Sequence, residues 1–379
     1  MRPRASTSAL TRAAAVALAM LVVGATSPAA PPATSVSAPA GMVLVPAGKF
    51  QMGDPFETEQ SDQVPIHTVH VSAFYMDKHK VTKKRWDDVR TWAQENGYSD
   101  TFARGAKGED HPALGMTWYD AVKWCNARSE KEGLTPVYYT TPEKTVVYRT
   151  GKVDIANDCV RWDANGYRLP TEAEWEKAAR GGAVGRRFPW DDTITHEQAN
   201  YNSGGRSQGK VPPYDLNPTR GNPPKFAVDQ EPYTSPVGSF PANGYGLHDM
   251  AGNAWDWVWD WYARDYYRLS PDSDPRGPAK DKATDGAKLL RGGSWYAGAD
   301  LVRCSMRGNN RVPDTRTENI SFRCVRIAND HGRVTQQLVQ FTLFCYDFTE
   351  VGMELRTLCK EAHRWSVLLR RSSIDYGLG

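Results

Sequence analysis

Four tryptophans alternate with smaller residues in one short segment of the chain. They occupy positions 255, 257, 259 and 261, and Asp256, Val258 and Asp260 lie between them. A period of two places successive side chains on opposite faces of a β-strand, so the segment predicts a strand with one indole face. Four indoles on one face favour a strand in the core. An exposed aromatic row that binds a sugar or a peptide is the alternative.

Three helices are predicted, each after a threonine that can cap its first turn. The third start is the clearest, because Thr171 and Glu174 form a capping box and Gly181-Gly182 follows the last turn. The predicted helices are residues 83–96 after Thr82, 118–131 after Thr117, and 172–180 after Thr171.

Short strands are predicted before these helices. Residues 42–52 are interpreted as a strand pair interrupted by Pro46-Ala47-Gly48, and residues 66–76 as one strand rich in β-branched and aromatic side chains. The 32 glycines and 25 prolines are typical of a chain with many fixed loops. Few helices and strands joined by structured loops predict an α+β domain.

The balance of charge argues against a nucleic-acid partner. The chain has 47 basic and 44 acidic residues, a formal net charge of +3. Arg2, Arg4 and Arg12 account for the whole excess, so the chain without its first residues is near neutrality. A nucleic-acid binder would need a dense basic patch.

The beginning of the chain predicts export. The three arginines precede an apolar run at 13–23 that ends in small residues, the layout of a secretory signal peptide over residues 1–25. The run is too short to span a bilayer, so we expect a secreted or periplasmic protein without a membrane span. An uncleaved anchor is the alternative. Residues 26–40 hold only Ala, Pro, Ser, Thr and Val, which predicts a disordered linker. The folded domain is then expected at 41–328, followed by an unassigned tail at 329–379.

A second dense region begins with RGGSW at 291–295, continues with RCSMR at 303–307 and ends with SFRC at 321–324. Paired glycines permit tight turns, and spaced arginines can hold loops through bidentate hydrogen bonds. Taken alone, this region predicts a structured loop.

Together with other segments, these motifs resemble the sulfatase-modifying-factor family, whose founding activity is formylglycine generation. The resemblance covers about residues 41–328 and implies an elaborated C-type-lectin-like α+β fold, loop-rich with few short helices and strands. The matching segments stand in family order: GMVLVPAG at 41–48, FYMD at 74–77, MTWYDA at 116–121, GYRLPTEAEWE at 166–176, PVGSF at 236–240, NGYGL at 243–247, GNAWDW at 252–257, RGGS at 291–294 and FRC at 322–324.

The resemblance implies an oxidase that converts a cysteine of an unfolded sulfatase to formylglycine with oxygen and copper. In the family, one copper-binding cysteine follows the serine of Gly-Gly-Ser by three residues, and the second lies five residues further on. Here Ala297 occupies the first place, and the second falls near Val302. Two thiolates form the soft site that suits Cu(I). Without them, neither copper nor the standard activity is expected, and the catalytic residue is unknown.

The resemblance also implies structural calcium in two oxygen-rich groups. Carboxylate, amide and backbone oxygens form the shell that calcium prefers. The alternative is that the acidic side chains are merely solvated. One group is Asp249, Gly252, Ala254 and Asp256, and the other is Asn200, Tyr201, Asp229 and Glu231.

Two disulfides are expected by position. Cys125 and Cys324 match a family disulfide. Cys304 matches half of another, whose family partner falls at Ala179; Cys159, in an insertion at 144–163, could replace that partner. A free, reactive Cys304 is the alternative.

Two functions follow from these observations. The first is a calcium-stabilised, lectin-like protein that binds an exported polypeptide or a small ligand through the loop at 294–317. Variable receptor proteins of diversity-generating retroelements resemble the same stretch, although their chains normally end soon after Phe-Arg. The alternative is a copper- and oxygen-dependent oxidoreductase that matures an exported protein. The candidate ligand contacts are Ser294, Trp295, Tyr296, Asp300, Arg307, Asn309, Asn310 and Arg311.

Overall fold

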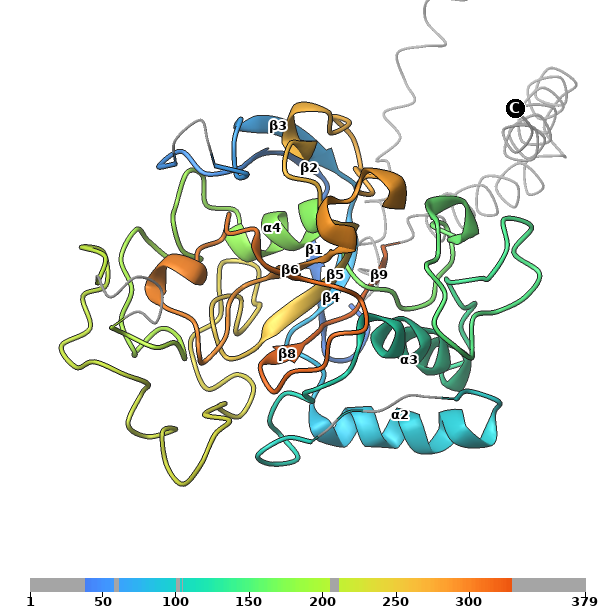
Figure 1. Cartoon of the computed structure of the whole chain (residues 1–379), viewed down its shortest axis with the longest axis horizontal. Helices are drawn as coiled ribbons and strands as arrows, with labels where there is room; N and C mark the ends of the chain where they lie inside the picture. Colours follow the sequence, from blue (N-terminus) through green and yellow to red (C-terminus); the bar gives the residue numbers. More distant parts are fainter. Residues whose placement is uncertain (1–37, 58–60, 100–102, 104, 205–210, 329–379) are drawn as a thin grey trace, which may run out of the picture. The chain divides into compact units, whose positions relative to one another are not determined.

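The computed structural model describes residues 38–57, 61–99, 103, 105–204 and 211–328 (Figure 1). The expected signal peptide, most of the expected linker and the tail lie outside these residues. Within the described ranges, no helix combines the length and the apolar character that a membrane crossing requires.

Short strands form three separate sheets in the described part of the chain. All neighbours are antiparallel except β5 and β8, which are parallel. The first sheet has the order β1 (Met42–Val45), β4 (Phe74–Asp77), β9 (Val325–Ile327), the second pairs β2 (Gly48–Met52) with β3 (His67–Val71), and the third has the order β7 (Gly308–Arg311), β6 (Lys288–Arg291), β5 (Trp255–Trp261), β8 (Ile320–Ser321).

Two strand predictions were wrong in their pairing and extent. Residues 42–52 form two strands, β1 and β2, that do not pair with each other. Instead, β1 pairs with β4 and β2 pairs with β3. The single strand predicted at 66–76 divides into β3 and β4. Ser72 causes the break, because its N–H and hydroxyl both donate to the carboxylate of Asp274 at 2.7 Å.

The three helix predictions were confirmed. They correspond to α2 (Lys83–Glu95), α3 (Trp118–Lys131) and α4 (Glu172–Arg180), and α2 and α3 lie side by side (Figure 1). Thr171 and Glu174 form the expected capping box, and Thr117 forms a second one with Asp120. The remaining turns of helix are η1 (Asn157–Cys159), η2 (Tyr266–Arg268), η3 (Lys280–Lys282), η4 (Thr284–Gly286) and η5 (Ala299–Leu301).

The strand β5 separates two hydrophobic clusters. Trp255, Trp257 and Trp259 belong to the larger cluster, which includes side chains of α2 and α3, whereas Val258 belongs to the cluster that packs against α4. All four tryptophans of the strand are at most 6% exposed. The prediction of a core strand was therefore confirmed, and the exposed aromatic row was wrong.

Buried charges connect α4 to the third sheet. Arg291 of β6 is fully buried and donates to Glu172 Oε1 at 3.0 Å and Glu176 Oε2 at 2.6 Å. Arg307 donates to both oxygens of Glu172, and Arg180 donates to Glu176. We call these five residues the Arg291 cluster. Burial raises the pKa of Glu172, but Arg307 and Arg291 outweigh this effect and hold it below its usual value. The cluster therefore fixes α4 relative to β6 as an ionised network.

Breaking this network should be strongly destabilising. We expect Glu176→Ala to lower the free energy of unfolding by about 3–5 kcal/mol, because Arg291 and Arg180 lose a buried partner. Urea denaturation followed by circular dichroism measures this loss. The matched control is Asp88→Ala, which breaks the exposed Lys84–Asp88 pair of α2 and should cost less than about 1 kcal/mol. Equal losses in the two variants would contradict a structural role for the cluster.

Candidate functional site

The loop that follows β6 turns on two glycines. Gly292 and Gly293 have φ angles of 89° and 74°, in the left-handed region that glycine tolerates. A Cβ atom on Gly293 would lie 2.4 Å from Cγ1 of Val302. The chain therefore folds back on itself, with Val302 packed beneath the turn.

Three of the candidate ligand contacts have buried side chains. Ser294 is completely buried, Trp295 is 4% exposed and Arg307 is 2% exposed. Arg307 belongs to the Arg291 cluster, and its guanidinium is 2.8 Å from Glu172 Oε1. These three side chains therefore pack inside the protein and are not available at the surface of the loop.

The remaining candidate contacts lie nearer the surface. Tyr296 is 39% exposed, Arg311 is exposed and Asp300 is half-buried. Asn309 and Asn310 belong to β7, but the description does not extend to their side chains. A ligand on this loop would therefore meet Tyr296, Asp300 and Arg311 first.

Tyr296 belongs to a group of three neighbouring aromatic side chains. The ring of Trp295 makes edge contacts with Tyr296 and with Tyr233, both at 5.5 Å between ring centroids. Lys107 Nζ lies 5.8 Å from the centre of the Tyr233 ring. We call Tyr233, Trp295 and Tyr296 the aromatic patch. Tyr233 and Lys107 were missed by the sequence analysis, since they come from distant segments and carry no motif of their own.

The resemblance places the first copper-binding cysteine at Ala297 and the second near Val302, and both of these residues are apolar and packed. Ala297 is 4% exposed and Val302 is fully buried, and both belong to the larger hydrophobic cluster. The carbonyl of Ala297 accepts a hydrogen bond from Asn202 N–H at 2.8 Å. Neither side chain offers a donor atom for a metal or a nucleophile.

One expected disulfide pair is in contact. Cys125 and Cys324 are buried free thiols with sulfur atoms 3.7 Å apart. Burial and the neighbouring Cys324 raise the pKa of Cys125 well above its usual value. The two residues join α3 to the segment before β9, so the structure brings together the pair that the resemblance implied. The covalent bond itself stays a prediction.

The structure does not bring the other pair together. Cys159 belongs to the larger hydrophobic cluster and Cys304 to the cluster around α4, and both are free. Burial raises the pKa of the Cys304 thiol to about 12, although Arg180 and Arg291 act in the opposite direction. This shift disfavours the thiolate, which is the reactive form of a cysteine.

The first group of expected calcium ligands is buried beside positive charge. Asp256 Oδ2 is 2.8 Å from Lys80 Nζ and 3.2 Å from Arg323 Nε, and these cations hold the pKa of Asp256 below its usual value despite burial. Asp249 Oδ2 accepts a hydrogen bond from Gly238 N–H at 2.9 Å. The second oxygen of each carboxylate is buried and has no hydrogen-bond partner.

The second group touches the first through Asn200. This residue forms a parallel bridge with Gly252, and its buried Oδ1 also has no hydrogen-bond partner. Tyr201 is buried, whereas Asp229 and Glu231 are exposed. In the described residues, no three His, Cys, Asp or Glu side chains are grouped to hold a metal. Backbone and amide oxygens would therefore have to complete either shell.

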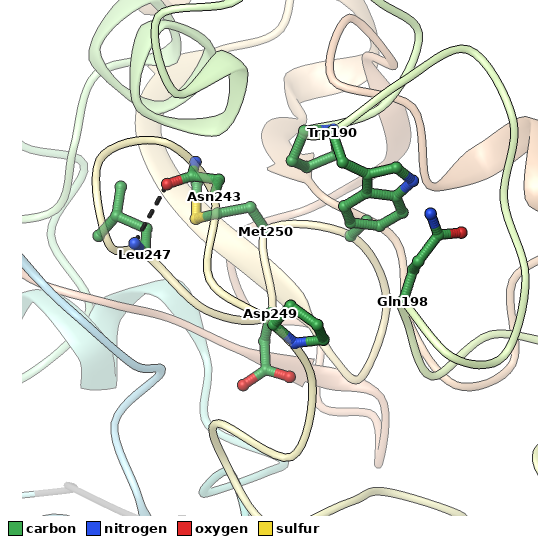
Figure 2. Close-up of a pocket in the computed structure, with 9 residues that line it drawn as sticks. Trp190, Gln198, Asn243, Leu247, Asp249 and Met250 are labelled. Carbon is green, nitrogen blue, oxygen red and sulfur yellow. Dashed lines mark hydrogen bonds between the residues drawn. The ribbon is translucent and has the colours of Figure 1, made fainter.

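A small hollow lies beside Asp249. It encloses about 200 Å³, including the solvent at its open side. Figure 2 shows Trp190 and Gln198 on one side, and the Asp249 carboxylate pointing away from Asn243. Clefts that bind small ligands usually measure about 300–1,000 Å³. The hollow is thus too small for a large ligand.

Comparison with known proteins agrees with this architecture. Residues 27–328 match the family described as sulfatase-modifying factor enzyme 1-like domain. The chain is 36% identical to the formylglycine-generating enzyme of Streptomyces coelicolor, over 82% of this chain and 97% of that protein. It is 33% identical to chaperone protein LppX of Paenibacillus barcinonensis, over 70% and 82% of the two chains. The solved structure of Treponema denticola variable protein 1 aligns with a TM-score of 0.54 and 28% identity, over 75% of this chain and 94% of that one. The expected loop-rich, C-type-lectin-like α+β fold is thus confirmed.

The contact between Cys125 and Cys324 generates a redox prediction. Under oxidising conditions we expect the bond to form and to raise the free energy of unfolding by about 3–5 kcal/mol, because it closes a long loop. Urea denaturation with and without reductant measures the difference, and peptide mapping identifies the cross-link. In the control, a double variant with Cys125→Ala and Cys324→Ala, reductant should have no such effect. A wild-type protein that is insensitive to reductant would contradict the bond.

Proposed function

The chain belongs to the sulfatase-modifying factor family, and on this premise we propose that it binds a polypeptide outside the cytoplasm without generating formylglycine. The observation that carries the proposal is the apolar character of Ala297, at the first cysteine position, and of Val302, near which the second position falls. An alanine methyl and a valine isopropyl group provide neither a copper ligand nor a nucleophile. The residues present therefore do not fit copper, and no oxidation step is assigned to this loop.

The surface around the loop supports binding of a polypeptide. Tyr296 is exposed, and the half-buried Tyr233 lies beside the Lys107 ammonium group; both rings contact Trp295. Exposed tyrosine rings supply large contact areas at low entropic cost and are common in protein-binding surfaces. The relative LppX is named a chaperone protein, a class that binds other polypeptides, which is consistent with this choice of ligand.

The leader supports a location outside the cytoplasm. Arg2, Arg4 and Arg12 before a short apolar run are typical of a secretory signal, so the proposed ligand is an exported polypeptide. A secreted or periplasmic location also permits the bond between Cys125 and Cys324.

Structural calcium is part of the proposal. Three buried oxygens without hydrogen-bond partners, on Asn200, Asp249 and Asp256, fit the need of a divalent cation for oxygen ligands. Bound calcium would hold the segment at 249–256 together in one site and would join the segments around 200 and 230 in the other. Asp249 and Asp256 would contribute the negative charge of one site, with the carbonyls of Gly252 and Ala254. Asn200, with Tyr201, Asp229 and Glu231, would form the other.

A second candidate function is oxidation of an exported protein. The alignment with a formylglycine-generating enzyme extends over nearly the whole length of that enzyme, which favours retention of a related substrate. This activity would require a ligand set other than Ala297 and Val302. The two candidates make opposite predictions about the fate of a bound peptide.

The decisive experiment offers the purified protein a sulfatase-derived peptide that contains the target cysteine, with copper and oxygen. We expect the peptide to bind and to remain unmodified in mass spectrometry. Tyr296→Ala should weaken binding by about tenfold, because it removes the exposed part of the aromatic patch. Fluorescence anisotropy of the labelled peptide measures the affinity.

Two controls accompany this experiment. Leu269→Ala removes an exposed apolar side chain outside the loop and should leave affinity unchanged. A peptide with its target cysteine replaced by alanine should bind equally well. Conversion of the cysteine at repeated turnover would overturn the non-catalytic part of the proposal, and absence of binding would overturn the choice of ligand.

Removal of calcium generates a separate prediction. A cation at about 100 times its dissociation constant stabilises by about 2.7 kcal/mol, so excess chelator should lower the melting temperature by roughly 5–10 °C. Asp249→Asn should reduce this shift. The matched control is Asp285→Asn, an exposed aspartate with the same φ angle of 55°. An unchanged melting curve in chelator contradicts structural calcium.

A further inference from the structure

Asn253 connects three separate segments of the chain. Its N–H donates to the carbonyl of Asn200 at 2.8 Å, and its carbonyl accepts from Trp295 N–H at 3.0 Å. Its side-chain amide exchanges two hydrogen bonds of 3.1 Å with the backbone of Ser235. The residue is completely buried and has a φ angle of 64°. Asn253 is therefore fixed by backbone and side chain at once.

The proposed calcium ligands lie on both sides of Asn253. Gly252 and Ala254, whose carbonyls belong to the first group, are its chain neighbours. Gly252 packs so closely against Asn200 that a Cβ atom would lie 2.2 Å from the Asn200 carbonyl oxygen. Asn200 carries one of the unpartnered oxygens, and Asp249 carries another. Cations in the two proposed sites would satisfy these oxygens and tighten the segments to which Asn253 is bonded.

The loop with the aromatic patch is attached to the same segments. Trp295 N–H is bonded to Asn253, and the carbonyl of Ala297 accepts from Asn202 N–H. The amide of Asn222 donates to the carbonyl of Trp295. Tyr296, the most exposed member of the patch, thus lies between two residues whose backbones are held by the segments around 200 and 253.

We propose that Asn253 transmits calcium binding to residues 295–297, so that calcium in the two sites orders the surface that binds the polypeptide. This inference rests on the proposed function. Without calcium, buried oxygens on Asn200 and Asp249 lack partners, which favours opening of these segments toward water. With calcium bound, the closed arrangement is favoured, and the hydrogen bond from Trp295 N–H to Asn253 transmits this effect to the loop. Coupling of this kind is reciprocal, so a ligand on the loop also strengthens calcium binding.

One substitution distinguishes the contribution of the Asn253 side chain from that of its backbone. Glycine adopts the positive φ angle at no steric cost, so Asn253→Gly keeps the backbone bonds to Asn200 and Trp295. It removes both bonds to Ser235, which hold the residue in place. Asn253 is a positioning residue in this scheme, and the variant should bind calcium while failing to order the loop.

The experiment measures hydrogen exchange at the amides of Trp295 and Ala297 with CaCl₂ or with chelator, and no polypeptide is added. In the wild-type protein we expect calcium to slow exchange by a factor of about 5 to 150, the range of typical allosteric couplings. In Asn253→Gly the slowing should disappear, although calorimetry still detects calcium binding. Asn253→Asp, which keeps one acceptor for Ser235 N–H, should show an intermediate effect and serves if the glycine variant does not fold.

The control variant is Asn126→Ala. Asn126 is also fully buried, and its side-chain amide makes four hydrogen bonds to the backbone of residues 137, 138 and 148. Loss of the Asn126 amide should lower the overall stability without changing the calcium response of the loop. If Asn253 had a merely structural role, Asn253→Gly and Asn126→Ala would instead affect that response equally.

Three results would overturn the inference. They are no calcium binding in calorimetry, calcium binding with unchanged exchange at both amides, and a normal calcium response in Asn253→Gly. None of these three results affects the peptide-binding experiment, because that experiment measures affinity for a peptide and the hydrogen-exchange experiment contains no peptide. A protein that fails to bind peptide but shows the calcium response would instead overturn the proposed function alone.

Discussion

The buried guanidinium of Arg291 is the interaction on which the rest of the structure depends. A charge in a dry interior is tolerated only when acids and carbonyls surround it, and here Glu172 and Glu176 of α4 supply the acids. The position of α4 relative to β6 is therefore fixed, and the carbonyls of Cys304 and Ser305 accept from the same guanidinium. Since β6 ends at Arg291, the glycine turn and the loop with the aromatic patch begin from a rigid point.

The alternation along β5 serves this arrangement on both faces. Three of its tryptophans belong to the larger hydrophobic cluster. Asp256, which is in register with Arg291, lies on the charged side and forms ion pairs with Lys80 and Arg323. A strand of this composition therefore cannot shift by one residue, because the shift would place carboxylates among indoles. The same register sets the place of Asn253 and Gly252, which immediately precede the strand.

Local signals in the sequence predicted the helices, the core strand and the glycine turn, because caps and periodicity act within a few residues. Non-local contacts decided the rest. The break in the strand predicted at 66–76 depends on Asp274, which is 202 residues from Ser72. Arg307, expected at the surface of the loop, is held inside by Glu172, 135 residues away. Likewise, the oxygens of Asn200 and Asp249 could be named from the family motifs, but only the structure places them beside Asn253.

The shape of the loop does not depend on the side chain at position 297, because backbone hydrogen bonds hold the loop. Trp295 is bonded through its N–H and its carbonyl, and Ala297 through its N–H to Ser294 and its carbonyl to Asn202. None of these bonds involves the side chain at position 297, so exchange of a thiol for a methyl group removes a metal ligand while leaving the loop intact. The packing of Val302 beneath Gly293 likewise needs an apolar group rather than a sulfur atom. A scaffold built in this way can lose an oxidation reaction and retain a binding surface, which is the physical basis on which we propose binding rather than catalysis.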